Sequence, residues 1–209
     1  YAGGALVHTL GGMSALVATM ILGPRIGRFS DYRPSSNKLV QLICRRSTDE
    51  DYYMTPPGNA PIQPVTDPIS LIWGTFFLWF GWYGFNPGAA LEVEGKGTYV
   101  VAHIVVNTTM GALGGGTCAF FVMLVRDRHR ILADGLAMGT LAGLAAVTSG
   151  CKFFGNGTSF LIGCLGSVVS MGVKFLLERF HLDDVVSAIP VHLGGGLFGT
   201  LAVAFFAQP

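Results

Sequence analysis

The sequence contains six long segments without a single Asp, Glu, Lys or Arg, and these segments constrain its fold more than any other feature. A helix needs about 20 predominantly apolar residues to cross a bilayer core of about 30 Å. Only 12% of the residues are charged, about half of the share in an ordinary soluble domain. We therefore predict an all-α, polytopic transmembrane helix bundle. The predicted spans are residues 1–23, 69–91, 97–125, 135–151, 153–173 and 185–209.

Basic residues between the spans predict the orientation, because cytoplasmic loops retain Lys and Arg. Eleven of the 13 basic residues lie on one side of the membrane and two on the other. Tyr1 and Pro209 are therefore expected outside the cell, and the loop 24–68 in the cytoplasm. The loops rich in Lys and Arg are residues 24–68, 126–134 and 174–184, and the other two basic residues are Lys96 and Lys152.

The chain is expected to be an internal fragment, because it begins inside an apolar segment without an initiating Met and ends in another. The loop 24–68 holds seven of the ten prolines, which favours an irregular connection. Residues 38–46 are interpreted as part of that loop, with a position in the membrane interface as the alternative. The net charge of +1 provides no field that would attract nucleic acid, so we expect no nucleic-acid partner.

Glycine makes up 30 of the 209 residues, and glycines recur at a spacing of four. Such spacing lets helix backbones approach closely in a membrane. We expect these glycines to pack helices rather than to bind a ligand. The sets are Gly111/Gly115, Gly135/Gly139/Gly143 and Gly195/Gly199.

The first and last spans resemble each other and each carries a histidine. Residues 7–12 read VHTLGG and residues 191–196 read VHLGGG, in spans of opposite direction, as in an inverted-topology repeat. At 1.5 Å per residue, His8 and His192 both lie near the middle of the bilayer. An ionisable group at that depth needs a partner and marks a path or site. We expect the two imidazoles to pair and share a proton, the alternative being two separate core histidines.

The second span contains the aromatic sequence LWFGWYGFN over residues 78–86. Trp82, Phe85 and Asn86 fall at i, i+3 and i+4 and share one helix face. Aromatic faces attract small cations, most strongly when the cation is desolvated. An aromatic belt at the membrane interface is the alternative explanation for the tryptophans.

Five ordered motifs together resemble the ammonium transporter family (Amt/Mep/Rh), and its Amt branch in particular. They are residues 2–8, 81–86, 107–108, 143–148 and 182–192. The resemblance implies one partial ammonium transporter domain over residues 1–209, similar to helices five to ten, so six of about eleven helices are present. In that family the first ten helices form an inverted five-plus-five repeat with the N-terminus outside, and the orientation deduced from the basic residues agrees.

The resemblance also implies a homotrimer in the plasma membrane, with one narrow hydrophobic pore per subunit. His8 and His192 match the histidine pair of the pore. Phe85 matches the inner member of an aromatic gate, Trp82 a pore-lining tryptophan and Thr148 a pore-proximal threonine. Departures from the family are Ala89, where a serine of the recruitment site is common, and Val185, where proline is common.

The function implied is transport of ammonium or ammonia, with methylammonium as an analogue, and not an enzymatic reaction. Ammonium would lose its hydration and pass as ammonia, its proton handled by the histidines or left outside. An ion in a dry pore is costly, whereas a neutral amine needs only weak polar partners. Potassium has no proton to lose and would be rejected. No cofactor and no metal are expected.

Other polar residues are interpreted mainly as structural. Asp183 and Asp184, before the last span, are expected to cap its N-terminus, with a proton path as the alternative, and Asp134 is expected to cap the fourth span. Asn86 is structural or part of that path. His103 and Asn107, one turn apart, are expected to bond internally rather than line the pore. The four cysteines lack the spacing of a metal site.

Two other function classes remain open at this level. One is a membrane sensor, in which the same pore binds ammonium without conducting it and signals to a cytoplasmic module. The other is a haem-binding electron carrier with His8 and His192 as axial ligands.

Overall fold

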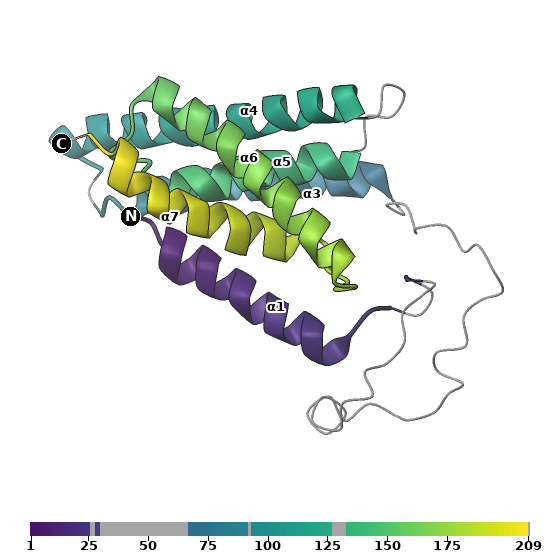
Figure 1. The fold of residues 1–209 in the computed structure, drawn as a ribbon. Coiled ribbons are helices and arrows are strands. Elements are labelled where there is room, and N and C mark those ends of the chain that lie inside the picture. The colour runs from purple at the N-terminus through teal and green to yellow at the C-terminus, as the bar shows by residue number, and fades with distance from the viewer. Residues whose placement is uncertain (26–27, 30–66, 92, 127–132, 209) are drawn as a thin grey trace.

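The structure is a computed structural model that describes residues 1–25, 28–29, 67–91, 93–126 and 133–208. It is all-helical in this part of the chain, as predicted (Figure 1). Most of the predicted loop 24–68, including residues 38–46, lies outside the described residues. The elements in order are η1 (Gly4–Thr9), α1 (Leu10–Leu22), α3 (Pro68–Gly88), α4 (Lys96–Arg126), α5 (Ala133–Thr148), α6 (Asn156–Arg179), η3 (Ile189–Gly195) and α7 (Gly196–Phe206), with η1 and η3 π-helical.

A helix occupies each of the six predicted spans. Four of the described helical segments are long and apolar enough to cross a membrane, whereas α5, with 16 residues, is shorter. The 21 residues of α3 are not among the four, and this helix carries many aromatic and polar side chains. The four are Gly4–Leu22, Lys96–Val125, Asn156–Arg179 and Ile189–Phe206.

Two predicted boundaries differ from the observed helix ends by more than three residues. The helix α6 continues to Arg179, six residues past the predicted end at residue 173, and so carries Lys174 on its last turns. Long basic side chains at a helix end can reach toward water, which allows this extension. The last helical segment begins at Ile189 rather than at residue 185, because Ser187 has a φ of 57°, in the left-handed region that interrupts a helix.

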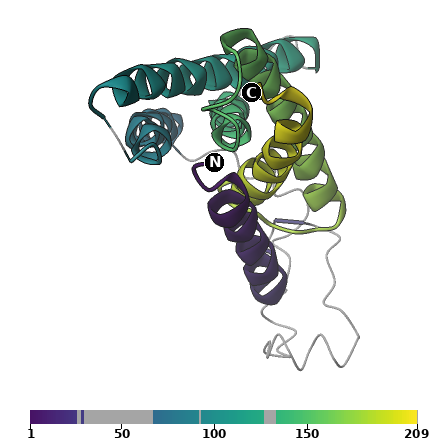
Figure 2. The same cartoon turned by 90° about the vertical axis from the view of Figure 1, so that its left-hand side faces the viewer.

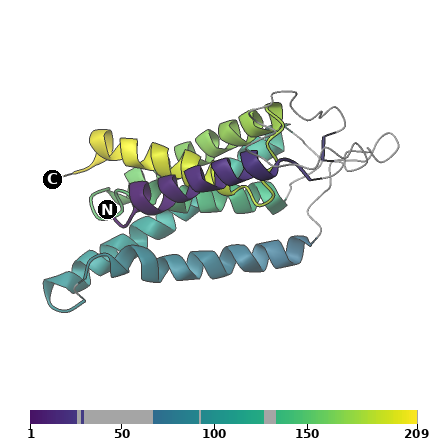
Figure 3. The same ribbon diagram turned by 90° about the horizontal axis from the view of Figure 1, so that it is seen from below.

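Helix α5 lies at the centre of the bundle. Figure 2 shows it between α3 on one side and α6 and α7 on the other, with α4 packed across them. Its residues from Ala142 to Thr148 are all buried, as are the next two residues of the chain. A helix that is apolar on all sides belongs in an interior. The N-terminal and C-terminal ends of the described chain lie at the same end of the bundle (Figures 1 and 3), and which membrane face this end occupies stays a prediction.

Glycines hold α4, α5 and α6 in backbone contact, as their spacing predicts. A Cβ atom on Gly115 would overlap the carbonyl oxygen of Gly139, and one on Gly143 would overlap that of Gly111. On α6, a Cβ on Gly163 would overlap the same Gly111 carbonyl. The three helices therefore approach closely at positions where no larger residue fits.

The substitution Gly115→Ala is expected to lower the stability of the full-length protein by about 1–3 kcal/mol, because overpacking forces the α5 backbone away. The matched control is Gly172→Ala on α6, where a Cβ would meet nothing within 4 Å in the described part of the chain. There the same change should be neutral or stabilising by up to about 1 kcal/mol, through helix propensity. Thermal unfolding in detergent measures both, and equal shifts for the two variants would contradict the packing argument.

Candidate functional site

His8 and His192 meet at the crossing of the first and last helical segments. Their Nδ1 atoms are 3.0 Å apart, and their rings are nearly parallel, with centroids 5.1 Å apart and planes inclined by 11°, so the rings meet edge to edge. At this distance one Nδ1 donates a proton to the lone pair of the other, so the pair shares one proton. The contact leaves no place for an iron between these two atoms.

Both histidines lie in π-helical turns, a feature that the sequence reading missed. His8 lies in η1 and His192 in η3, each followed directly by an α-helix. Single π-helical turns are rare in proteins, and those that do occur are often found at functional sites. Pro190 in η3 is a signal for a disturbed helix, because proline has no N–H to donate. In η1 the corresponding signal is weaker, since this turn contains no proline and follows directly on Ala2 and Gly3, with φ values of 42° and 88°.

The glycine four residues after each histidine allows the two segments to cross. A Cβ on Gly12 would lie 2.7 Å from the Cβ of Leu193, and a Cβ on Gly196 would lie 2.7 Å from the Cβ of His8. Both distances are too short for real atoms, so the repeat sequence His-x-x-x-Gly specifies both the imidazole and the close approach that brings the imidazoles together.

Aromatic residues of α3 contact the histidine pair. The Trp82 ring lies nearly parallel to that of His8, with the ring centroids 5.1 Å apart and the planes inclined by 19°. Phe85 contacts His8 edge-on at 5.6 Å and Trp82 at 6.1 Å. Trp82 is buried, whereas 38% of Phe85 is exposed, so Phe85 forms the open edge of this group.

Thr148 contributes by fixing Trp82. The indole Nε1 of Trp82 donates to Thr148 Oγ1 at 3.0 Å, and this hydroxyl donates to the carbonyl oxygen of Leu144 at 2.7 Å. Thr148 is fully buried at the end of α5. The central helix therefore sets the position of the tryptophan that stacks on His8.

Asn86 shares a helix face with Trp82 and Phe85, and its side chain bonds to α4. Its Nδ2 donates to Thr108 Oγ1 on α4 at 3.0 Å, and that hydroxyl donates to the Ile104 carbonyl. Asn86 is completely buried. Its geometry is that of a helix-to-helix contact.

His103 and Asn107 bond inside the protein, as predicted. Asn107 Nδ2 donates to the carbonyl oxygens of Cys151 and Phe154, at 2.9 and 2.6 Å. His103 Nε2 lies 3.0 Å from the same Phe154 oxygen. These contacts attach the turn after α5 to α4.

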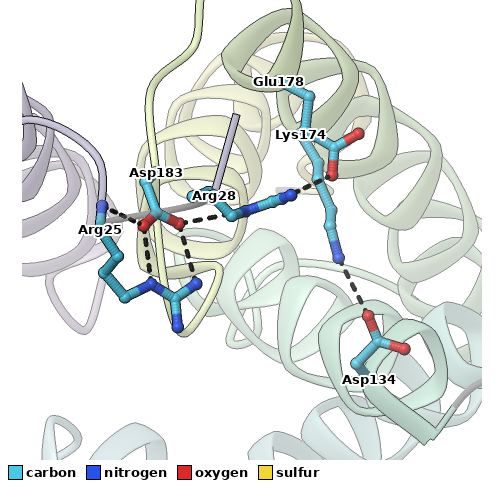
Figure 4. Close-up of polar contacts among 6 residues, drawn as sticks. All are labelled: Arg25, Arg28, Asp134, Lys174, Glu178 and Asp183. Atoms are coloured by element: carbon cyan, nitrogen blue, oxygen red, sulfur yellow. Dashed lines mark hydrogen bonds and ion pairs between the residues drawn. The ribbon is translucent and has the colours of Figure 1, made fainter. Parts of the chain in front are cut away.

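Asp183 does not cap the last helix, which corrects the sequence prediction (Figure 4). Its carboxylate accepts from Nε and Nη2 of Arg25, at 2.7 and 3.0 Å, and lies 3.4 Å from Nε of Arg28. Burial alone disfavours the charged carboxylate, but the hydrogen bonds and charge of Arg25, with the charge of Arg28, outweigh it. They hold the pKa of Asp183 below its ordinary value.

Asp184 does accept hydrogen bonds at the start of the last helix. Its two carboxylate oxygens accept from the backbone N–H groups of Ala188 and Ile189, at 3.1 and 2.6 Å. Asp134, in the first turn of α5, instead accepts from Lys174 Nζ of α6 at 3.2 Å (Figure 4). Among the described residues, no group of three or more His, Cys, Asp or Glu side chains could hold a metal ion.

Comparison with known proteins gives consistent results. The sequence model described as the Ammonium Transporter Family matches residues 1–43 and 51–209. The ammonium transporter Amt2 of Archaeoglobus fulgidus is 33% identical over 208 residues, which cover all of this chain and 38% of that protein. A solved structure named Sensor Amt Protein is 34% identical, with a TM-score of 0.75, over all of this chain and 44% of that one. The crystal structure of Saccharomyces cerevisiae Mep2 is 25% identical, with a TM-score of 0.76, and is covered to 40%.

The substitution Thr148→Val is expected to destabilise the full-length protein by about 1–3 kcal/mol, because the buried Trp82 N–H loses its acceptor. In the background Trp82→Phe the same change should cost much less, since both partners are then apolar. Chemical unfolding of the four proteins of this cycle measures the coupling. Strictly additive free energies would show that the bond does not contribute.

The ion pair of Asp183 predicts a loss of stability in acid. Because the pKa of Asp183 is lower in the folded protein than its ordinary value of 3.8, the ion pair stabilises fully above that pH. The stabilisation is lost as the pH falls through the lower folded value. Unfolding of wild type and Asp183→Asn should differ by a constant amount above about pH 5 and converge below about pH 4. A difference that grows in acid would contradict the assignment.

Proposed function

Because the chain belongs to the Ammonium Transporter Family, we propose that the whole protein conducts ammonium or ammonia across a membrane through a pore lined by His8 and His192. The chain spans about two fifths of the length of the relatives that it matches. The observation that supports this proposal most is the pair of imidazoles, the buried one of His8 and the partly buried one of His192, joined by Nδ1 atoms 3.0 Å apart, with aromatic rings beside His8.

The chemistry of the pair suits a small amine rather than a metal cation. One proton lies between the two Nδ1 atoms, and His8 Nε2 is buried with no partner among the described residues. A buried ring nitrogen without a partner is free to form a hydrogen bond with a molecule that passes it. Ammonia both donates and accepts, whereas a bare potassium ion would lose its hydration with little in return.

Phe85 is proposed as the gate and Trp82 as part of the pore wall. Phe85 is the more exposed of the two and lies edge-on to His8 at 5.6 Å. The face of an aromatic ring attracts a cation that has lost water. Ammonium would be attracted there and give its proton to the free ring nitrogen of the histidine pair, so that ammonia enters the dry region, since a charged species in that region is costly.

The chain is part of a multi-pass membrane protein, and its environment follows from its surface. Large apolar side chains are exposed in numbers that a soluble protein does not show. On α3 they include Trp73, Phe76, Phe77 and Phe80, between 56% and 77% exposed. We propose that lipid, the remaining helices and neighbouring subunits of a homotrimer cover them, in the plasma membrane with Tyr1 and Pro209 outside.

The decisive test is uptake of methylammonium or ammonium by the full-length protein in a cell that lacks its own transport. Replacing His8 and His192 together by Ala should abolish or strongly change uptake. Each single change should cost nearly as much as the double change, because the two rings share one proton and act as a unit. His181→Ala, in the loop after α6, is the matched control. Unchanged uptake in the double variant would refute the pore role.

An ammonium sensor is the second candidate, favoured by the similarity to the structure named Sensor Amt Protein. A sensor would bind ammonium at the same aromatic group without conducting it. Full-length protein that binds methylammonium in equilibrium assays but takes up none in vesicles would establish this function and refute transport.

A further inference from the structure

Two adjacent carboxylates between α6 and η3 bind different parts of the chain. Asp183 accepts from Arg25, which follows α1, and Asp184 accepts from the first N–H groups of the segment that leads into η3. His8 lies in η1, which continues directly into α1, and His192 lies in η3. The adjacent residues Asp183 and Asp184 therefore hold the two segments that carry the paired histidines. The contacts on Asp183 and the separate Asp134–Lys174 pair appear together in Figure 4.

Burial and hydrogen bonding together favour one geometry for the contact between Asp183 and Arg25. Its side chain is 2% exposed, whereas that of Arg25 is 45% exposed. A buried carboxylate needs compensation, and two parallel N–H···O bonds from one guanidinium supply both charge and direction. The backbone N–H of Arg25 also donates to Asp183 Oδ2 at 3.0 Å, so the main chain as well as the side chain is held. Only Gly23 and Pro24 separate Arg25 from α1.

The Asp184 contact fixes the beginning of η3. The N–H groups that begin a helix have no partner within it, and Asp184 satisfies two of them. On the other side of this turn, Ser170 Oγ of α6 donates to the Pro190 carbonyl at 2.7 Å. His192 follows two residues later, so its ring is attached to a segment held from both directions.

The Arg25 bonds act at the far end of the helical segment that carries His8 near its start. The two segments touch at Gly12 with Leu193 and at His8 with Gly196, so they cross between these contacts, near Leu10. At 1.5 Å per residue, His8 lies about 3 Å from this crossing along the helix, and Leu22 about 18 Å away on the other side. A tilt about the crossing that moves His8 by about 1 Å therefore moves the far end by about 6 Å. Such a movement would break the Arg25 bonds, so they oppose the tilt.

We propose that Asp183 and Asp184 are positioning residues that together hold the segments of His8 and His192 at the angle at which their Nδ1 atoms pair. The effect on transport rests on the proposed function of the pair, whereas the effect on its geometry does not. This role differs from a proton path, because the carboxylates act through the backbone and need not contact the transported molecule.

The test compares Asp183→Asn, Asp184→Asn and the double variant Arg25→Gln/Asp183→Asn in the full-length protein. The matched control is Asp134→Asn, which removes an ion pair between α5 and α6, neither of which carries a paired histidine. Nitrogen-15 solid-state NMR reports the hydrogen bond between the two Nδ1 atoms, and methylammonium uptake reports transport. Asp184→Glu, which keeps two acceptor oxygens, tests rescue.

The three variants are expected to lose or weaken the Nδ1–Nδ1 signal and to lower uptake by about ten- to a hundredfold, as for a misplacement of about 1 Å. Asp134→Asn should retain both, and Asp184→Glu should recover part of them. If Asp183→Asn does not accumulate, the double variant decides, because it leaves no unpaired charge on either residue.

An intact Nδ1–Nδ1 signal in the Asp183 and Asp184 variants would overturn the proposal, whatever uptake does. Lost uptake with an intact signal would assign the carboxylates to a proton path instead. If the wild-type protein transports nothing, the proposed function fails, but the NMR comparison still decides the positioning role.

Discussion

Backbone contact between helices at glycine positions is the constraint on which the rest of this structure depends. Lipid is as apolar as leucine, so helices in a membrane gain little from hiding apolar side chains and associate through close packing. On α4, α5 and α6, the glycines at 111, 115, 143 and 163 leave no room for a Cβ. The same device appears at the crossing of the first and last segments, where it also sets the distance between the histidines.

Glycine contacts bring the helices together but leave each helix free to rotate about its own axis. Polar contacts between side chains then fix that rotation. Thr148 binds the indole of Trp82, and Asn86 binds Thr108, so each contact ties α3 to a different neighbour. Such bonds specify a unique arrangement because each buried polar group is costly without its partner. The first of these contacts holds the Trp82 ring, which lies within 19° of parallel to that of His8.

Each histidine of the pair lies in an irregular part of its helix that is nevertheless closely packed. Each imidazole lies in a π-helical turn, where the backbone departs from regular α-helix, yet each turn is followed by a close glycine contact. The π-helical turn and the glycine contact occur in both copies of the repeated sequence.

The sequence by itself predicted the helical class and the six spans, each of which a described helix occupies, and it favoured the pairing of His8 with His192. These features depend on uncharged length and on a repeated local pattern, which are properties of contiguous residues. The family was also evident from ordered motifs. Helix ends were less accurate, because a basic residue can continue a membrane helix, as Lys174 does in α6.

Only the tertiary structure decided the partners of the other polar residues. Asp183 and Asp184 are adjacent and look equivalent in the sequence, yet one binds Arg25, 158 positions away, and the other binds the start of η3. Trp82 and Thr148 are 66 positions apart. Such pairings depend on which helices lie side by side, and no local pattern encodes that. The physical reason is that a buried donor or charge takes the nearest acceptor in space, whatever its position in the chain.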